Sequence, residues 1–373
     1  MGKSKKIVPV LQPTFGDTGE MIRKFQRLFE SRQITLGTYT RELEQAVSDY
    51  LGVPHVVAVS SCTSGLILAL KALRLEGEVI LPAFTFAASA HALVWCGLRP
   101  VFCDCDRETL SIDTRRAEEL ITKRTAALMP VYIFGSAPDW EPLERISKKH
   151  SIPILADAAQ GLGASYQGRK AGRFGAVEIF SLSPTKIITA GEGGLITTRD
   201  GDLARTLRKL RDYGKAEDGE DMEMIGLSAR LSEFHAVIAL ENLKWIDVWM
   251  EKRRGLIDTY REGLDGLPGI RYPTLPEGSS SSWNYMVLLI DNEIAPFGRD
   301  DLYLRLKEKG IQTKRYFYPP AHLLAVYREM LGPDLPSLPA TELISRQALA
   351  LPLYSHMSEV DVRAICGSIR SCA

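Results

Sequence analysis

The chain has 373 residues, more than one typical domain contains, so we expect a large domain and a smaller one. An apolar content of 45% and a charged content of 25% are typical of a globular protein and argue against a disordered or membrane-embedded chain. The 46 basic and 46 acidic residues cancel, so the composition indicates no general attraction to nucleic acid or to an anionic membrane.

Targeting and metal-binding patterns are not evident in the sequence. The basic stretch Met1–Lys6 precedes a short apolar run that contains Pro9, and this run is too short for a signal or a membrane span. We therefore expect a cytoplasmic protein. The six cysteines and six histidines show no ligand spacing, so we expect free thiols and no metal site.

Short apolar runs alternate with segments of helical periodicity from about residue 56 to residue 198. This pattern predicts an α/β domain built on a mostly parallel sheet of seven strands. Helical stretches such as Ala87–Trp95 and Trp140–His150 fall between the strands. The predicted strands are Val56–Val59, Val79–Leu81, Val101–Phe102, Leu128–Tyr132, Ile152–Ala156, Glu178–Phe180 and Gly194–Thr197.

The segment after this sheet is predicted to lead into a second domain. The helical stretch Leu203–Tyr213 is followed by a polar, acidic interval around Glu217–Glu223 and by one long helix from Ser232 to about Tyr260. We expect this helix to link the two domains. The large domain, with an N-terminal arm, is placed at residues 1–245, and the small domain at residues 246–373.

The final third of the chain is predicted to be an α+β domain. Pro273–Ser282 is rich in proline, glycine and serine and is typical of a loop. Beyond it we expect strands at Tyr285–Ile290 and Gly310–Phe317, on either side of a helix at Arg299–Lys309.

The apolar run that ends in Asp157, with Gln160 three residues later, is the most informative segment. A parallel sheet delivers such an acid to the carboxyl ends of its strands, where ligands bind in open α/β sheets. A mostly buried acid there needs a cationic partner to stay ionised, and a protonated pyridine nitrogen supplies one. The alternative is that Asp157 caps the next helix.

A lysine and a glycine run follow the next apolar run. Lys186 comes five residues after Ser181, and Gly191, Gly193 and Gly194 precede a further strand. A lysine amine can form an imine with an aldehyde cofactor when its pKa is depressed, and glycines let the backbone pass close to a ligand. Taken alone, such a lysine is usually a solvated loop residue.

Two earlier segments each follow a predicted strand. The hydroxyl-rich Ser60–Leu66 precedes a helix, where free N–H groups favour phosphate and where Thr63 and Ser64 add donors, although an ordinary helix cap is the alternative. Phe86, in Pro82–Ala88, could stack on a planar ring or pack in the core. A glycine fingerprint for dinucleotides is missing after the early strands, which argues against a nicotinamide enzyme.

Taken in order, four segments resemble the motif series of the DegT/StrS-type sugar aminotransferases, which are fold type I pyridoxal-phosphate enzymes. These segments are Ser61–Gly65, Pro82–Phe86, Asp157–Gln160 and Ser181–Gly194. The resemblance spans most of the chain. It implies the fold type I architecture, with a large cofactor-binding domain and a smaller C-terminal α+β domain, and it implies pyridoxal 5′-phosphate as cofactor.

The same resemblance implies a role for each matching residue. Lys186 would form the Schiff base with the cofactor, and Asp157 would hold the pyridine nitrogen protonated. Gln160 would contact the ring hydroxyl, and Phe86 would stack against the ring. The phosphate would be bound by three hydroxyl residues: Thr63, Ser64 and Ser181.

Some positions depart from the family pattern. Ser228 stands where the family usually has an asparagine that reaches the phosphate of the neighbouring subunit, and Pro184 and Thr185 precede the lysine where asparagine or glycine is common. If Ser228 serves the partner's site, the active unit is a symmetric homodimer with shared sites. The segment Tyr316–His322 resembles a family stretch near the sugar pocket, with a packing role as the alternative.

The resemblance predicts an aminotransferase of amino-sugar biosynthesis. Some family members have histidine in place of the lysine and catalyse dehydration, so the retained Lys186 favours transamination. By family analogy, L-glutamate would donate the amine and a nucleotide-linked keto-sugar would accept it in a ping-pong cycle. The alternatives are an unlinked ketone such as a keto-cyclitol, a non-catalytic cofactor-binding sensor, and a nicotinamide enzyme.

Overall fold

A mostly parallel sheet forms the centre of the large domain. The computed structural model describes residues 7–216 and 218–373, so the basic stretch at residues 1–6 and Glu217 of the predicted acidic interval lie outside the described residues. The strands of this sheet are β1 (His55–Val59), β2 (Glu78–Pro82), β3 (Arg99–Cys103), β4 (Thr125–Leu128), β5 (Leu155–Asp157), β8 (Val177–Ser181) and β9 (Gly194–Thr198).

The strand order is β1-β9-β8-β5 in one part and β4-β2-β3 in the other. Parallel bridges from Leu128 to Ile154 and from Val131 to Asp157 join the two parts. Strand β9 is antiparallel to both of its neighbours, whereas the β2-β3, β2-β4 and β5-β8 pairs are parallel. The predicted α/β class and mostly parallel seven-stranded sheet are therefore confirmed in the described part of the chain.

Two predicted strands lie partly out of place, and proline explains both shifts. The strand predicted at Leu128–Tyr132 ends at Leu128, because Pro130 has no N–H with which to continue the ladder. The strand predicted at Ile152–Ala156 begins only at Leu155, after Pro153.

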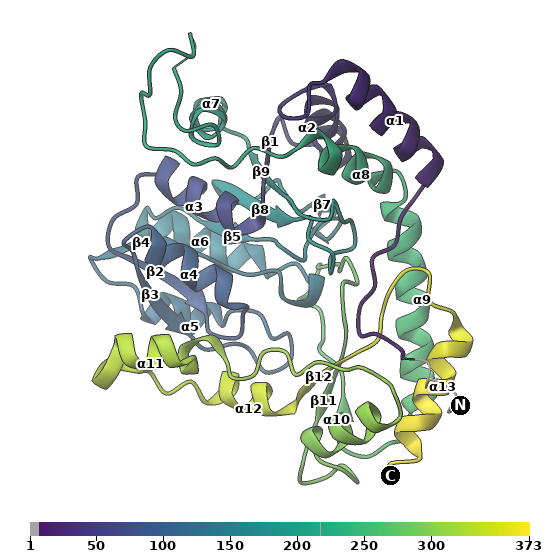
Figure 1. The fold of residues 1–373 in the computed structure, drawn as a ribbon. Coiled ribbons are helices and arrows are strands. Elements are labelled where there is room, and N and C mark those ends of the chain that lie inside the picture. Colours follow the sequence, from purple (N-terminus) through teal and green to yellow (C-terminus); the bar gives the residue numbers. More distant parts are fainter. Residues whose placement is uncertain (1–6, 217) are drawn as a thin grey trace.

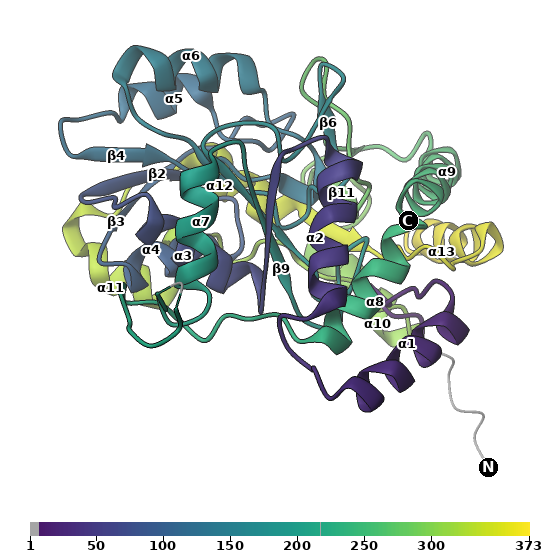
Figure 2. The ribbon, with the colours of Figure 1, turned by 90° about the horizontal axis from the view of Figure 1, so that it is seen from above.

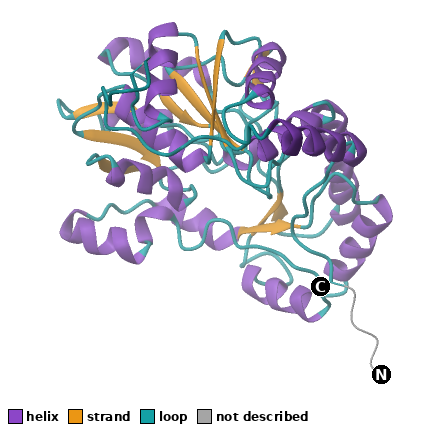
Figure 3. Cartoon of the chain, turned by 45° about the horizontal axis from the view of Figure 1, so that its top comes forward, coloured by secondary structure: helices purple, strands orange, loops and turns teal. Residues whose placement is uncertain are grey.

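Helices cover both faces of this sheet, as Figures 1 and 3 show. Alternate residues of β1 enter different cores: Val57 packs with α3 (Cys62–Ala72), α4 (Ala87–Trp95) and α7 (Gly201–Leu210), whereas Val56 packs on the opposite face. The helices on that opposite face are α2 (Thr38–Leu51), α6 (Trp140–His150) and α8 (Glu233–Leu243). A sheet buried on both faces accounts for its near-continuous apolar runs.

Shorter elements complete the large domain. They are α1 (Thr18–Ser31) in the N-terminal arm, α5 (Thr114–Glu119), the 3₁₀ turn η1 (Ile133–Gly135), and the hairpin of β6 (Ser165–Tyr166) and β7 (Arg169–Lys170). Buried Glu233 at the start of α8 accepts the N–H groups of Gly37, Tyr39 and Thr40, which caps α2 from a distant part of the sequence.

The prediction of one long helix from Ser232 to Tyr260 is wrong. Helix α8 ends at Leu243, and a separate helix, α9 (Ile246–Leu264), begins after a turn at Trp245. Buried Asn242 explains the break, because its side chain donates to the Thr189 carbonyl and accepts the Gly16 N–H. These two distant bonds fix the end of α8, and hydrophobic periodicity cannot reveal them.

The C-terminal part contains a small antiparallel sheet of β10 (Ile270–Arg271), β11 (Met286–Ile290) and β12 (Ala348–Leu351). Helices α9 and α13 (Glu359–Arg370) lie side by side and α10 (Arg299–Glu308) lies nearby, as Figures 1 and 2 show. The predicted strand at Gly310–Phe317 is wrong. In the described chain this segment makes only two isolated bridges, Ile311 with Val8 and Lys314 with Ala350. Because the two bridges join different segments, no continuous ladder forms and the segment is not a strand.

Part of the C-terminal third packs on the large domain. In Figure 1, α11 (Ala325–Leu331) and α12 (Pro339–Gln347) run beneath the sheet of the large domain. Tyr327 and Leu338 share a core with Phe102 of β3. The remaining short elements are the 3₁₀ turns η2 (Ala321–Leu323) and η3 (Gly332–Asp334). The boundary at residue 245 therefore stays a prediction.

Across the described residues, no helix has both the length and the apolar content required to cross a membrane.

A buried carboxylate braces the strand that leads into the site. Glu178 of β8 is fully buried, accepts the N–H groups of Gly172 and Phe174 at 2.7 Å, and accepts the Tyr132 hydroxyl at 2.6 Å. Burial raises the pKa of Glu178 to about 7, although these three hydrogen bonds oppose the shift. Strand β8 is thus tied to the loop after β4 and to the turn before β8.

We predict that Glu178→Gln makes stability less dependent on pH. Because the folded state holds the Glu178 proton more tightly than the unfolded chain, the free energy of unfolding should fall by about 3 kcal/mol as the pH rises from about 4.5 to about 7. The amide cannot ionise, so this contribution should vanish. Urea denaturation across this pH range tests the prediction, with exposed Glu144→Gln as control. An unchanged slope in Glu178→Gln would contradict it.

Candidate active site

A cavity of about 380 Å³ opens at the carboxyl ends of the parallel strands. The segments that follow β1, β2, β4, β5 and β8 each contribute residues to its wall, and further residues come from the C-terminal part of the chain. Open α/β sheets bind ligands at this edge, because the loops that leave neighbouring strands converge there. The cavity is large enough for a substituted aromatic ring and part of a second molecule.

Six of the eight predicted site residues line this one cavity. The first and the last of them are 123 residues apart in sequence. The six are Thr63, Phe86, Asp157, Gln160, Ser181 and Lys186. The cavity wall does not include Ser64 or Ser228. The structure therefore brings together most of the residues that were picked from separate motifs.

Asp157 and Lys186 form the charged centre of the cavity. Burial raises the pKa of Asp157, while hydrogen bonds from Ser89 and Ala159 and the positive charge of Lys186 lower it. Burial also lowers the pKa of Lys186, which increases the fraction of neutral, nucleophilic amine. The site thus combines an acid that lacks a full cationic partner with an amine that is activated by desolvation.

Gln160 offers a polar atom with no partner in the chain. Its side chain is 8% exposed, and its Oε1 atom is buried without a hydrogen bond from any described residue. A buried acceptor of this kind costs free energy unless a ligand or water donates to it. Because Gln160 lines the cavity, a ligand with a ring hydroxyl fits this vacancy in the hydrogen-bonding pattern.

One end of the cavity suits a phosphate group. Helix α3 begins at Cys62, and its first N–H groups have no intrahelical partner. The hydroxyl residues Thr63 and Ser181 line the wall there. Ser64 instead caps the helix, because its hydroxyl donates to the Ser61 carbonyl and accepts the Ser61 N–H in a capping box.

Gly194 lets strand β9 approach this phosphate-sized end of the cavity. A Cβ atom at Gly194 would lie 2.7 Å from the Cys62 nitrogen and from the carbonyl carbon and oxygen of Ser61. All three atoms belong to the backbone, so no side chain could move aside. The glycine run predicted from sequence therefore permits close packing of β9 on the N-terminus of α3.

The wall opposite the sheet comes from the C-terminal part of the chain. Tyr285, Lys314, Tyr316 and Phe317 line it, and the Phe317 ring lies 6.5 Å from the ring of Phe86. The predicted placement of Tyr316–His322 near the pocket holds for Tyr316 and Phe317. His322 instead is fully buried near Phe102, outside the cavity.

Sequence motifs missed several wall residues. Cys62 and Thr85 lay inside quoted motifs but were given no role. Ser89, in the first turn of α4, lies behind the wall, where its hydroxyl donates to Asp157. Tyr285 and Lys314 had no local signal, because only the packing of the two parts brings them to the cavity.

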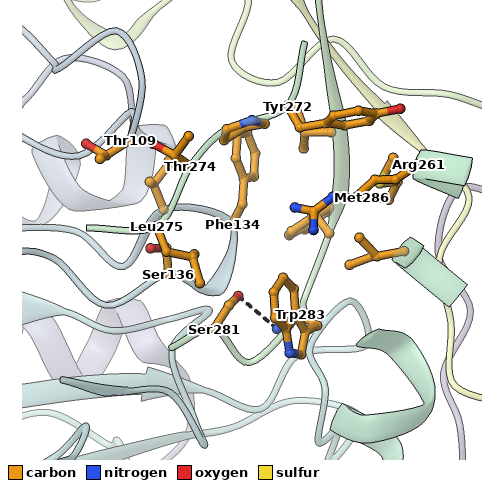
Figure 4. A pocket seen from close by; sticks show the side chains of 15 residues that line it. Thr109, Phe134, Ser136, Arg261, Tyr272, Thr274, Leu275, Ser281, Trp283 and Met286 are labelled. Atoms are coloured by element: carbon orange, nitrogen blue, oxygen red, sulfur yellow. Dashed lines mark hydrogen bonds between the residues drawn. The ribbon is translucent and has the colours of Figure 1, made fainter. Parts of the chain in front are cut away.

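A second, smaller cavity lies on another side of Tyr285 and is shown in Figure 4. Its volume is about 50 Å³, and its wall includes Arg261, Tyr272 and Trp283. This volume suits water but not a pyridine ring with a phosphate. No group of metal-ligating side chains suitable for an ion occurs among the described residues. The larger cavity is therefore the candidate active site.

Comparisons with known proteins identify the family of this chain. The sequence model of the DegT/DnrJ/EryC1/StrS aminotransferase family matches residues 17–370. The GDP-perosamine synthase of Caulobacter vibrioides is 34% identical over 342 residues, which are 90% of each chain. The structure of DesI in the presence of its TDP-sugar product superposes with a TM-score of 0.93 and 32% identity over 99% of this chain and 93% of that one.

A third relative concerns the cofactor. The putative sugar aminotransferase Spr1654 of Streptococcus pneumoniae, solved in its PLP-form, has a TM-score of 0.90 and 25% identity, with 98% of each chain covered. The chain therefore belongs to the DegT/DnrJ/EryC1/StrS aminotransferase family and is a pyridoxal-phosphate-dependent aminotransferase of fold type I. The unpartnered Gln160 oxygen, the buried Asp157 and the helix end at Cys62 fit this cofactor.

We predict that Gly194→Ala destabilises the protein by about 1–3 kcal/mol, because the added methyl group overlaps backbone atoms. Pyridoxal phosphate should also bind more weakly, since the N-terminus of α3 must move. Denaturant unfolding and titration of the apo-protein with the cofactor measure both effects. Gly255→Ala is the matched control, because a Cβ there meets nothing within 4 Å. Equal stability of the two variants would contradict the close-packing argument.

Proposed function

We propose that this aminotransferase transfers the amino group of L-glutamate to a nucleotide-linked keto-sugar. The observation that carries the proposal is the joint presence, in one cavity, of a desolvated lysine, a buried acid and an unpaired cation at the outer wall. The named relatives support a sugar acceptor, since one is a GDP-perosamine synthase and another was solved with a TDP-sugar product.

In this proposal each cavity residue has one task. Lys186 binds the cofactor covalently through its amine, and Asp157 accepts a hydrogen bond from the protonated pyridine nitrogen. Gln160 accepts from the ring hydroxyl, and exposed Phe86 covers the ring. Thr63, Ser64 and Ser181 hold the phosphate together with the N-terminus of α3, with Ser64 acting mainly through the capping box it forms.

Bound pyridoxal phosphate supplies an aldehyde that accepts the amine and a conjugated ring that withdraws electrons from the reacting carbon. Asp157 keeps the ring nitrogen charged, which strengthens this withdrawal. Lys186, once released from the cofactor, would move a proton between carbon atoms as general acid and base, and burial favours this role because it lowers the pKa of the amine toward the neutral, proton-accepting form. The aromatic wall keeps bulk water away from these steps.

Ser228 is proposed to complete the site of a partner subunit. Within its own chain it is exposed and lies outside the cavity, and among the described residues its hydroxyl is hydrogen-bonded only by Arg230, at 3.4 Å. Ile225, three residues before it, is 98% exposed, and Phe86 at the cavity mouth is 61% exposed. Large apolar side chains exposed to solvent are typical of an interface, so a symmetric homodimer is the proposed active unit.

Lys314 is the proposed contact for an anionic part of the substrate. Its exposed ammonium lies 5.4 Å from the ring centre of Tyr316, and no carboxylate of the described chain lies in ion-pair range. Lysine is a common ligand for phosphate groups. A nucleotide-linked sugar carries a diphosphate, whereas an unlinked keto-cyclitol does not, so Lys314 favours the first acceptor class over the second.

We predict that Lys186→Ala abolishes amino transfer and leaves the fold intact, since Lys186 supplies both the covalent attachment and the proton transfer. The test follows the visible absorption of the protein with pyridoxal phosphate before and after L-glutamate, and thermal unfolding of the apo-protein. The wild-type band should shift on addition of glutamate, and the variant should show no such shift. Substantial remaining turnover would remove Lys186 from its role; a wild-type band unmoved by glutamate would point to another donor.

We predict that Lys314→Ala raises KM for a nucleotide-linked keto-sugar by about tenfold, because a charge-assisted contact is lost. The value of kcat should change little, and KM for L-glutamate should not change. Exposed Lys307→Ala, on α10, is the control. A raised KM for glutamate alone would assign Lys314 to the donor carboxylate, and equal activity on an unlinked keto-cyclitol would favour that acceptor.

A further inference from the structure

The carboxylate of Asp157 is held by a chain of two hydroxyl groups that comes from the start of α4. The Ser89 hydroxyl donates to Asp157 Oδ2 at 2.6 Å, and the Thr85 hydroxyl lies 2.9 Å from that of Ser89. Ser89 is fully buried and Thr85 is 3% exposed. The other carboxylate oxygen, Oδ1, accepts the Ala159 N–H at 3.0 Å.

Counting hydrogen atoms gives this chain a direction. A hydroxyl has one hydrogen to donate, and the ionised carboxylate can only accept, so Ser89 donates to Asp157. Ser89 must then accept from Thr85, whose hydroxyl becomes the outer donor. The Phe86 carbonyl, 3.2 Å from Ser89, is the weaker competitor for the same hydrogen because the carboxylate is closer and charged.

This direction depends on the charge of Asp157. Hydrogen bonds in series polarise one another, and in a buried site each is stronger than it would be in water. If Asp157 took up a proton, its own hydroxyl could donate and the preferred direction of the chain would be lost. Among the described residues, the titratable groups that interact with Asp157 are Lys186, whose positive charge lowers the pKa of Asp157, and Cys62, whose own pKa is raised by burial and by Asp157. The Thr85 hydroxyl is also at the cavity wall, beside the space for the cofactor.

We propose that Thr85 and Ser89 are positioning residues, which hold Asp157 ionised and fixed in orientation so that it can pair with the charged pyridine nitrogen of the cofactor. Neither residue touches the reacting atoms. The inference rests on the proposed role of Asp157, and it adds a cause for that role: burial alone disfavours a charged carboxylate, and the two hydroxyls offset part of that penalty.

The test measures binding of pyridoxamine 5′-phosphate to the apo-protein by calorimetry from about pH 5 to about pH 9. This probe cannot bond to Lys186, so its affinity reports the non-covalent contacts alone. We expect Ser89→Ala to weaken binding about tenfold at neutral pH, because a hydrogen bond to a charged group is lost. The pH at which binding weakens on acidification should rise by about one unit, since Ser89 favours ionised Asp157.

Further variants separate positioning from simple packing. Thr85→Val should shift the same pH midpoint in the same direction but less, and Ser89→Thr should retain the wild-type midpoint. Ser147→Ala is the matched control, because it removes a hydroxyl on α6 that donates to the Ile152 carbonyl at 2.6 Å and lies outside the cavity. Thermal unfolding of each apo-protein checks folding. Should Ser89→Ala be too unstable to measure, Thr85→Val carries the test alone.

Three results would each overturn a statement. If Asp157→Asn shifts the pH profile of binding but Ser89→Ala and Thr85→Val do not, the positioning inference fails while the role of Asp157 stands. If Asp157→Asn leaves the pH profile unchanged, the role of Asp157 fails, and the inference fails with it. A Ser89→Ala protein that loses affinity equally at every pH would show a packing effect only.

Discussion

The burial of one carboxylate at the end of β5 is the constraint on which the site depends. Asp157 is 5% exposed, and an isolated charge at that depth would be strongly disfavoured. Three surrounding elements each stabilise the charged carboxylate: α4 supplies the Ser89 hydroxyl, the turn after β5 supplies the Ala159 N–H, and the loop after β8 supplies Lys186. In the role proposed for Asp157, the cofactor's charged ring nitrogen is its remaining partner.

The sheet makes this convergence possible, because its parallel strands end at one edge. Loops after five strands meet there, so residues far apart in sequence share one wall. Strand β9 runs the other way, and Gly194 at its start lets it pack directly on the backbone of Ser61 and Cys62. A closely packed frame of this kind holds a charged cofactor in one orientation, which suits chemistry that depends on alignment.

The C-terminal part of the chain completes the cavity wall opposite the sheet. Its residues close the cavity with Tyr285, Tyr316 and Phe317 and bring one cation, Lys314, to the outer wall. The aromatic wall is joined to the large domain by ring contacts, since Phe317 lies 5.5 Å from Phe84 and 5.8 Å from Phe134. In the proposed function, the chemistry takes place at the sheet edge and the opposite wall recognises the second substrate.

The sequence by itself indicated the seven strands of the large sheet and six of the cavity's residues, because apolar runs, strand-end acids and glycine runs are local signals, and its resemblance to a known family indicated the cofactor. It could not determine where α8 ends, since the bonds of Asn242 join distant segments, nor that residues 310–317 form no strand. Ser89 and Lys314 became visible only in the tertiary structure. Local pattern sets which element forms, whereas partners across the fold decide which side chains meet, and the hydroxyl chain to Asp157 exists only through such a meeting.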